Sequence, residues 1–498
     1  MTILAIDAGT TGVTALLVSK DARVLARGYS EFEQRFPADG WVEHDPNEIW
    51  AATIAALEQV CASDAISEHG APTAVGITNQ RETIVLWDRE TLGSARMAIV
   101  WQDRRTAGLC DQLKADGHEK RVTELTGLRL DPYFSGTKLS WIAKQEPNVW
   151  AGVKEGRTAI GTVDSYLIAR MSRGVTHVTD ASNASRTLLF DINTGQWSQE
   201  LCDLFGVPID ALPEVVPSYG VVGMTDPSVF AGLEIPIAGI AGDQQAALFG
   251  QAGFIPGASK CTYGTGSFVL VNTGDRIVRS DAGLLSTVAW MNPDRSLTYA
   301  LEGAIFVTGS AIQWLRDGLG IIESAAETDE IARSVPNSAG VVFVPALTGL
   351  GAPDWDPNAR GAIFGLTRGA TSAHVVRATL EAIAFEVRDV VDVMVNEAKV
   401  ELPRLTVDGG AAANNFLCQI QADQIRVPVA RSENLETTGL GAAFLAGLGT
   451  GLWSSMQELA ATWHSDRTFE PESRDEQAHR RWRVAVERTK GWSTAVSK

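Results

Sequence analysis

Asp7-Ala8-Gly9-Thr10-Thr11-Gly12 lies near the start of the chain between two apolar runs, residues 3–6 and 13–18. The pattern returns in the second half as Gly264-Thr265-Gly266-Ser267, followed by the apolar residues 268–271. Each copy predicts a strand, a tight turn and a second strand. Glycine lets the backbone approach a ligand closely and threonine hydroxyls add donors, a combination that suits phosphate. One such turn is more often a plain hairpin, but two in two halves indicate a duplicated architecture around one nucleotide.

Length and charge limit the class of protein. The chain has 498 residues, enough for two or three domains that each have a core. Its net charge of −18 comes from 60 acidic and 42 basic residues. This excess of acid counts against a nucleic-acid or anionic-membrane surface, because those partners need basic patches. ATP stays open as a ligand, since backbone amides, a few side chains and Mg²⁺ are enough to hold it.

Cysteine usage and hydropathy predict a soluble, cytoplasmic protein. The cysteines are odd in number and lack C-x-x-C spacing, so we expect neither a disulfide framework nor a zinc site. They are Cys61, Cys110, Cys202, Cys261 and Cys418. No apolar run approaches the roughly 18 residues that a membrane span requires.

Strands alternate with helices in both halves, which predicts an α/β protein of two similar lobes with the ligand between them. Strands are expected near residues 2–7, 12–19, 23–31, 74–78 and 235–240, and again near 260–271 and 405–408. Helices are expected near residues 104–116, 137–146, 163–172 and 198–205, and after Asp45-Pro46, where Asp45 is the N-cap. The Gly/Pro-punctuated residues 250–257 suggest a boundary, with domains at 1–250 and 251–498.

Other nucleotide-binding signatures are missing. The chain has no G-x-x-x-x-G-K-[ST] loop and no H-R-D followed by D-F-G. Gly439-Leu440-Gly441 comes late and is followed by Ala442-Ala443-Phe444, which fits close helix packing better than a Rossmann fingerprint.

Several long motifs carry a family resemblance. They are residues 40–46 (G-W-V-E-H-D-P), 76–82 (G-I-T-N-Q-R-E), 101–105 (W-Q-D-R-R), 131–138 (D-P-Y-F-S-G-T-K), 239–251 (G-I-A-G-D-Q-Q-A-A-L-F-G-Q), 262–268 (T-Y-G-T-G-S-F), 349–354 (G-L-G-A-P-D) and 408–416 (D-G-G-A-A-A-N-N-F). On these strings the chain resembles the FGGY carbohydrate kinases, up to about residue 450. The resemblance implies two ribonuclease-H-like, actin-like lobes, with ATP and a polyol meeting in the interdomain cleft.

Within that family the motifs are most similar to those of members that phosphorylate glycerol. The resemblance implies that the triol hydroxyls bind Arg81, Glu82, Tyr133, Asp243 and Gln244, and that its carbon backbone lies against Trp101 and Phe268. A triol does present donors and acceptors on one side and C–H bonds on the other. Without the motifs, a solvated Arg81–Glu82 pair and a core Trp101 would be the better interpretation.

Asp243 is the predicted general base, because it follows a strand and a glycine and should project into the cleft. The resemblance implies that Asp7, with Asp243 sharing its shell, holds Mg²⁺ through water, as Mg²⁺ keeps waters and needs few protein oxygens. An aspartate in either place is otherwise more often a local helix or turn cap.

The resemblance also assigns the nucleotide contacts. Thr10, Thr11 and Gly12 are expected at the β- and γ-phosphates of ATP, with Thr265 opposite them. The adenosine is expected against Gly309, Gln313, Gly410 and Asn414.

The chain departs from the family pattern in two places. Glycerol-phosphorylating members usually continue the first Gly-Thr-Thr with Ser-Ser-Arg, where this chain has Gly12, Val13 and Thr14. An unreplaced charged contact there would weaken phosphate binding by about 1.5–3 kcal/mol. Some members bind an anionic sugar-phosphate inhibitor through an arginine in a loop that here reads Gly232-Leu233-Glu234. An acid in that loop repels such a ligand.

The sequence therefore predicts ATP-dependent phosphorylation of glycerol to sn-glycerol 3-phosphate. One alternative is a kinase of the same fold that acts on erythritol, dihydroxyacetone or a pentulose. A second is a catalytically weak, nucleotide-binding actin-like module, against which the intact set of Asp243, Arg81 and Glu82 counts. Whether the chain forms a homo-oligomer, dimer or tetramer, stays open.

Overall fold

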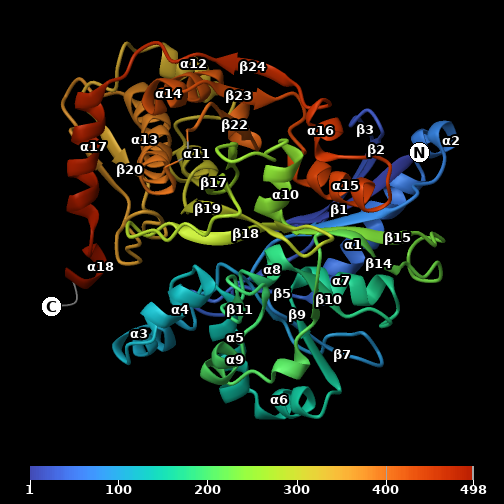
Figure 1. Ribbon diagram of the computed structural model, residues 1–498. Helices are drawn as coiled ribbons and strands as arrows, with labels where there is room; N and C mark the ends of the chain where they lie inside the picture. The colour runs from blue at the N-terminus through green and yellow to red at the C-terminus, as the bar shows by residue number, and fades with distance from the viewer. Residues whose placement is uncertain (400, 496–498) are drawn as a thin grey trace.

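The computed structural model describes residues 1–399 and 401–495. Two large mixed sheets lie in its upper part, and a body of helices hangs below the first sheet (Figure 1). The first sheet has the order β14-β15-β6-β1-β2-β3. Its strands are β1 (Thr2–Ala8), β2 (Gly12–Ser19), β3 (Val24–Glu31), β6 (Val75–Asn79), β14 (Tyr219–Met224) and β15 (Pro236–Gly242).

The second sheet repeats this pattern. Its order is β18-β19-β17-β16-β22-β23-β24. The strands are β16 (Ser259–Tyr263), β17 (Ser267–Gly274), β18 (Leu285–Met291), β19 (Leu297–Ile305), β22 (Leu405–Asp408), β23 (Val429–Ser432) and β24 (Ser465–Phe469). In each sheet three strands pair antiparallel (β1-β2-β3; β16-β17-β19) and two more add in parallel (β6, β15; β22, β23). The prediction of two similar α/β lobes is confirmed.

Helices cover both faces of the first sheet, so its central strands are buried throughout. On one face lies α1 (Pro46–Cys61), which begins as predicted: the Asp45 carboxylate accepts a hydrogen bond from the Asn47 N–H at 2.8 Å. On the other face lies α15 (Thr437–Gly449), which comes from the second half of the chain. Each half of the sequence therefore contributes to the core of the first lobe.

Two helices cross between the sheets, α15 and α10 (Asp243–Gly250) (Figure 1). Their approach is so close that a Cβ on Gly441 would overlap the Ala246 carbonyl, and one on Gly250 would overlap the Thr437 carbonyl. Only glycine permits this contact. The interpretation of Gly439-Leu440-Gly441 as helix packing is thus confirmed.

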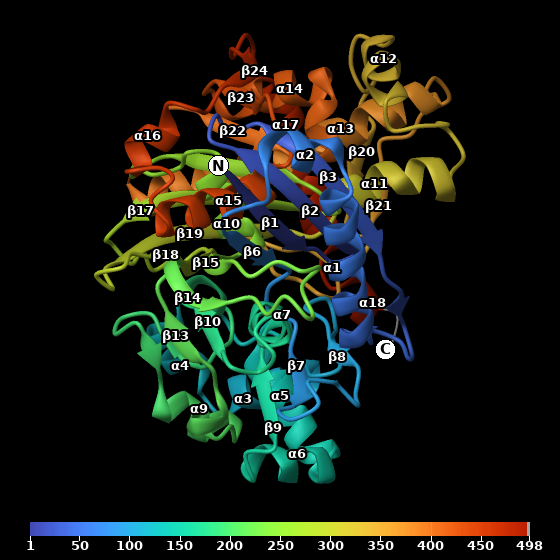
Figure 2. The same cartoon turned by 90° about the vertical axis from the view of Figure 1, so that its right-hand side faces the viewer.

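A large insertion between β6 and β14 forms the lower body, which Figure 2 shows from the side. Its helices are α3 (Ala107–Ala115), α4 (Glu119–Thr126), α5 (Ser135–Gln145), α6 (Pro147–Lys154), α7 (Val163–Met171), α8 (Ala181–Ala184) and α9 (Gln199–Phe205). Of these, α3, α5, α7 and α9 lie close to the predicted ranges, whereas α4, α6 and α8 were not predicted. Its short strands include β7 (Val85–Asp88), β8 (Ala98–Ile99), β9 (Thr158–Gly161) and β10 (Val178–Asp180). This body places Trp101, Tyr133 and Arg186 beneath the junction of the two sheets.

The second sheet is covered by α13 (Ser372–Ala398), with α14 (Asn415–Ile425) and α12 (Glu327–Arg333) beside it. The short α11 (Gly309–Gln313) follows β19. Near the C-terminus α17 (Glu476–Thr489) packs against α13 and β20 (Val342–Val344), at the left edge of Figure 1. Among the described residues, none of the helices is both long and apolar enough to cross a membrane.

Candidate active site

Four buried charges alternate where the two lobes meet. Glu302 on β19 accepts hydrogen bonds from both terminal nitrogens of Arg81, at 2.6 and 3.1 Å. It also accepts one from Arg186 at 2.8 Å, and the Nε of Arg186 donates to Glu82 at 2.7 Å. None of the four side chains is more than 2% exposed. A second-lobe carboxylate therefore fixes the first-lobe arginine that the sequence predicts as a substrate ligand.

Arg81, Glu82, Arg186 and Glu302 are called the quartet below. The charge state of each member follows from how the four side chains pair. Burial would raise the pKa of Glu302, but Arg186 and Arg81 outweigh it and hold that pKa at about 2. For Glu82 burial wins over Arg81 and Arg186, so its pKa is raised. Buried charges are tolerated only when they are paired in this way. Arg186 and Glu302 were missed by the sequence reasoning, since neither lies in a motif that we singled out.

An aromatic cluster lies beside the quartet and consists of the rings of Trp101, Tyr133 and Phe268. The Trp101 ring centre lies 5.7 Å from that of Tyr133 and 6.2 Å from that of Phe268. The Arg81 guanidinium carbon lies 5.7 Å from the Phe268 ring centre, and Arg81 donates to the Tyr133 hydroxyl at 3.2 Å. The predicted polar and apolar contacts for a triol are therefore neighbours in space.

Trp101 is more than an apolar wall. Its indole N–H donates to the Thr10 hydroxyl at 3.0 Å. This bond ties the aromatic cluster to the first glycine-threonine turn, which joins β1 to β2. It also occupies one lone pair of the hydroxyl predicted to meet phosphate.

Asp243 opens α10 directly after β15 and Gly242, as the sequence predicts. Its carboxylate is 27% exposed, and an oxygen lies 3.2 Å from the Arg81 Nε. Burial raises its pKa, against the attraction of Arg81 and Lys260. A carboxylate whose proton affinity is raised, and which is still accessible, is suited to accept a proton from a bound hydroxyl.

Gln244 is held by a lysine that the sequence reasoning did not single out. The buried ammonium of Lys260, on β16, donates to the Gln244 side-chain oxygen and to the Thr262 hydroxyl. Burial lowers the pKa of Lys260 to about 8. Because the Gln244 oxygen is taken, its amide N–H₂ is the group left to meet a ligand.

Asp7 lies near Asp243 at the end of β1. Burial raises the pKa of Asp7 to about 8, and the charges of Asp243 and Glu436 add to this against Arg27. Among residues 1–399 and 401–495, none donates a hydrogen bond to the Asp7 carboxylate. A buried carboxylate whose pKa a neighbouring carboxylate raises fits a divalent cation, which prefers oxygen ligands. No group of three metal-binding side chains exists in the described part of the chain.

A cavity of about 550 Å³ lies in the second lobe. Every residue predicted for adenosine lines it, together with one residue of the second turn: Gly309, Gln313, Gly410, Asn414 and Thr265. The backbone ties these parts together, since the Gly309 N–H donates to the Gly264 carbonyl at 3.0 Å. The first turn, Thr10 to Gly12, does not line this cavity.

A second cavity of about 490 Å³ lies between the lobes and is mainly apolar. Trp101 and Tyr133 line it from the first lobe, and residues 347–357 contribute from the second. Thr265 lines both cavities. The predicted nucleotide site and the cavity beside the aromatic cluster therefore share one lining residue.

Comparison with known proteins gives consistent matches. The models for the FGGY family of carbohydrate kinases match residues 2–250 with the N-terminal domain and 259–450 with the C-terminal domain. A glycerol kinase from Symbiobacterium thermophilum is 52% identical over 494 residues, which cover 99% of each chain.

Solved structures agree. The chain is similar to a glycerol kinase from Plasmodium falciparum, determined with ADP, with a TM-score of 0.90, 35% identity and 98% of both chains covered. A xylulose kinase from Lactobacillus acidophilus has a TM-score of 0.86 at 21% identity, covering 100% of this chain and 98% of that one, and shows the shared fold alone.

Proposed function

Because the chain belongs to the FGGY family of carbohydrate kinases, we propose that it transfers the γ-phosphoryl group of ATP to glycerol, giving sn-glycerol 3-phosphate. The observation that carries this proposal is the Asp243 carboxylate, 3.2 Å from Arg81 and beside the aromatic cluster. Curated relatives that are about half identical over nearly the whole chain are glycerol kinases.

In this proposal the triol binds across the quartet. Arg81 and the Gln244 amide donate to its hydroxyls, Glu82 accepts from them, and Tyr133 adds a further contact. The C–H side lies against Trp101 and Phe268. The quartet holds the Arg81 side chain in place before the ligand binds. Little rearrangement of that side chain is therefore needed at the moment of reaction.

Asp243 takes the proton of the terminal hydroxyl as the hydroxyl oxygen bonds to the γ-phosphorus, while the bond from that phosphorus to the β–γ bridging oxygen breaks and ADP leaves. The transition state of phosphoryl transfer is largely dissociative, so positioning and charge neutralisation contribute more than proton abstraction. Arg81, next to Asp243, stabilises negative charge on the attacking oxygen.

The nucleotide spans the two lobes. Thr10, Thr11 and Gly12 meet the β- and γ-phosphates from the first lobe, residues 1–250, and Thr265 faces them. The adenosine occupies the cavity lined by Gly309, Gln313, Gly410 and Asn414 in the second lobe, residues 251–498, of which 400 and 496–498 lie outside the described residues.

Asp7 and Asp243 would hold Mg²⁺ through water, and the ion would supply positive charge near the phosphates. Asp7→Asn is expected to raise the free Mg²⁺ needed for half-maximal activity by about 10–100-fold, the usual effect of losing a water-mediated partner. The measurement is turnover at saturating glycerol against free Mg²⁺. Asp21→Asn, at an exposed acid after β2, is the control, and equal Mg²⁺ dependence in both variants would remove Asp7 from the site.

Fructose 1,6-bisphosphate is expected to leave activity unchanged. The exposed Glu234 follows Gly232 and the half-buried Leu233, so the loop offers an anion a negative charge. The measurement is turnover on glycerol with millimolar fructose 1,6-bisphosphate. A several-fold inhibition would show that this loop, or another surface, binds the bisphosphate.

The alternatives make different demands on the site. A pentulose kinase would need room beyond three carbons, where Trp101, Tyr133 and Phe268 now stand. A weak nucleotide-binding module would have no use for the intact set of Asp243, Arg81 and Glu82. The first test is ADP release by the purified protein with glycerol, compared with ATP hydrolysis in its absence. No glycerol-dependent release would defeat the proposal.

A further inference from the structure

A long loop, residues 345–361, joins β20 to β21 (Ala362–Phe364), and one side of it faces the interlobe cavity. The loop residues that line this cavity are Leu347, Thr348, Leu350, Trp355 and Pro357. Trp101 and Tyr133, from the aromatic cluster, line the same cavity. The loop is therefore one wall of a cavity that two residues of the proposed triol site also line.

The other side of this loop is held by the C-terminal segment. Arg483 of α17 binds both oxygens of Asp354, at 3.0 and 3.3 Å, and Lys490 binds Asp354 at 2.8 Å. Just beyond the helix, the Gly491 N–H donates to the Asp356 carboxylate at 2.7 Å, and the Ser493 N–H donates to the Asn358 carbonyl at 3.0 Å. Three acceptors in five consecutive loop residues are thus bound by one segment.

The same helix is anchored to the core. Arg483 also binds Asp389 of α13 at 2.8 Å, and His479 binds the other Asp389 oxygen at 2.7 Å. Asp354 and Asp389 are each only about one tenth exposed, so water screens these pairs less than pairs on the open surface. Burial opposes the charge of Asp354, but the hydrogen bonds from Arg483 and Lys490 hold its pKa below the ordinary value.

The loop is also held by packing, since Ala346, Leu350 and Ala359 are buried in a cluster with Phe385 of α13 and Trp482 of α17. Two hydrogen bonds to other parts of the chain add to this. The Ala352 N–H donates to the Ala304 carbonyl at 2.8 Å, and the Trp355 indole N–H donates to the Gly283 carbonyl. A 17-residue loop without regular structure loses much conformational freedom when it is ordered, so each fixed attachment matters.

We propose that Arg483 and Lys490 are positioning residues for the polyol site, acting through Asp354 on the loop of residues 345–361. This inference rests on the proposed function for its kinetic consequence. None of the residues of this loop lines the nucleotide cavity, so a loosened loop affects the polyol and leaves ATP binding unchanged.

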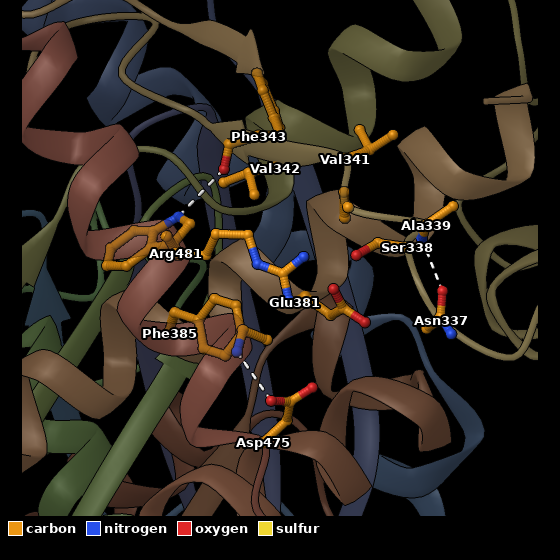
Figure 3. A pocket seen from close by; sticks show the side chains of 14 residues that line it. Asn337, Ser338, Ala339, Val341, Val342, Phe343, Glu381, Phe385, Asp475 and Arg481 are labelled. Atoms are coloured by element: carbon orange, nitrogen blue, oxygen red, sulfur yellow. Dashed lines mark hydrogen bonds between the residues drawn. The ribbon is translucent and has the colours of Figure 1, made fainter. Parts of the chain in front are cut away.

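Arg483→Gln tests the proposal, with Arg481→Gln as the matched control. Arg481 lies two residues earlier on α17 and lines a different, outward cavity of about 230 Å³ together with Glu381 and Asp475 (Figure 3). In the described part of the chain, no hydrogen bond or ion pair links Arg481 to the loop. Both variants remove one guanidinium from the same helix.

The expected result for Arg483→Gln is a KM for glycerol raised roughly fivefold or more, with the KM for ATP and kcat unchanged. Hydrogen–deuterium exchange of residues 345–361 should be faster than in the wild type. Arg481→Gln should match the wild type in both measurements. Arg483→Lys, which keeps the charge, should recover part of the glycerol KM.

The proposal would be overturned if the loop of Arg483→Gln exchanged hydrogen for deuterium at the wild-type rate. It would also be overturned if the two glutamine variants had the same KM for glycerol. If Arg483→Gln does not fold, Lys490→Gln gives the same comparison while it leaves the pair of Arg483 and Asp389 in place. A wild-type protein without activity on glycerol would defeat the proposed function instead, and the exchange experiment would still decide whether the helix holds the loop.

Discussion

Asp243→Asn is expected to lower kcat for glycerol phosphorylation by about 10²–10⁴-fold, the usual contribution of a general base. Asparagine keeps the size of the side chain and can still accept from the Gln244 N–H, but it cannot take a proton. The affinity for ADP should stay within about twofold, because Asp243 does not line the nucleotide cavity. The measurements are steady-state kinetics on glycerol and calorimetric titration with ADP.

Asp45→Asn is the control for this variant. Asp45 adopts an extended conformation and caps α1, and asparagine caps a helix about as well as aspartate. Normal turnover in both variants would mean that Asp243 serves only to begin α10, and would remove it as the base.

Glu302→Gln is expected to reduce the free energy of unfolding by about 3–5 kcal/mol, because it removes the carboxylate that both buried arginines share and leaves them only Glu82 and the partly exposed Asp243. The KM for glycerol should rise with it, since Arg81 loses the partner that fixes its orientation. The measurement is urea unfolding followed by tryptophan fluorescence, together with steady-state kinetics.

Glu200→Gln provides the comparison. Glu200 pairs with Arg121 at 2.7 Å, but both side chains are about half exposed, so the unfolding midpoint should not move. An unchanged midpoint in Glu302→Gln as well would show that the quartet does not stabilise the junction of the lobes.

The duplicated fold could be predicted because its signals are local. Apolar runs interrupted by glycine and threonine mark β1–β2 and β16–β17, and Asp45-Pro46 marks the start of α1. The packing of a helix from the second half of the chain on the sheet of the first lobe could not be predicted in the same way. That α15 covers the first sheet depends on a packing contact with α10, which lies far away in the sequence.

The candidate site likewise has residues that could be predicted from the sequence and residues that could not. Arg81, Glu82 and Asp243 stand in continuous motifs, so their neighbourhood was foreseeable. Glu302 lies on a strand 221 residues from Arg81, and its role appears only when β19 meets the end of β6. Lys260 is similar: in the sequence it is one lysine in a strand, and only burial reveals its bond to Gln244.

The turn between β1 and β2 is one place where the chain departs from the family pattern. Val13 and Thr14 are buried in β2, and the Thr10 hydroxyl already accepts from Trp101. The expectation that this turn grips phosphate with fewer donors than in its relatives therefore stays a prediction.

The most direct test is the ranking of kcat/KM for glycerol, dihydroxyacetone, erythritol and xylulose with ATP as the donor, with glycerol 3-phosphate identified as the product. The aromatic cluster and the quartet predict that glycerol ranks first and that xylulose gives little or no turnover. A higher kcat/KM for xylulose or erythritol than for glycerol would contradict the assignment of this pocket to a three-carbon triol.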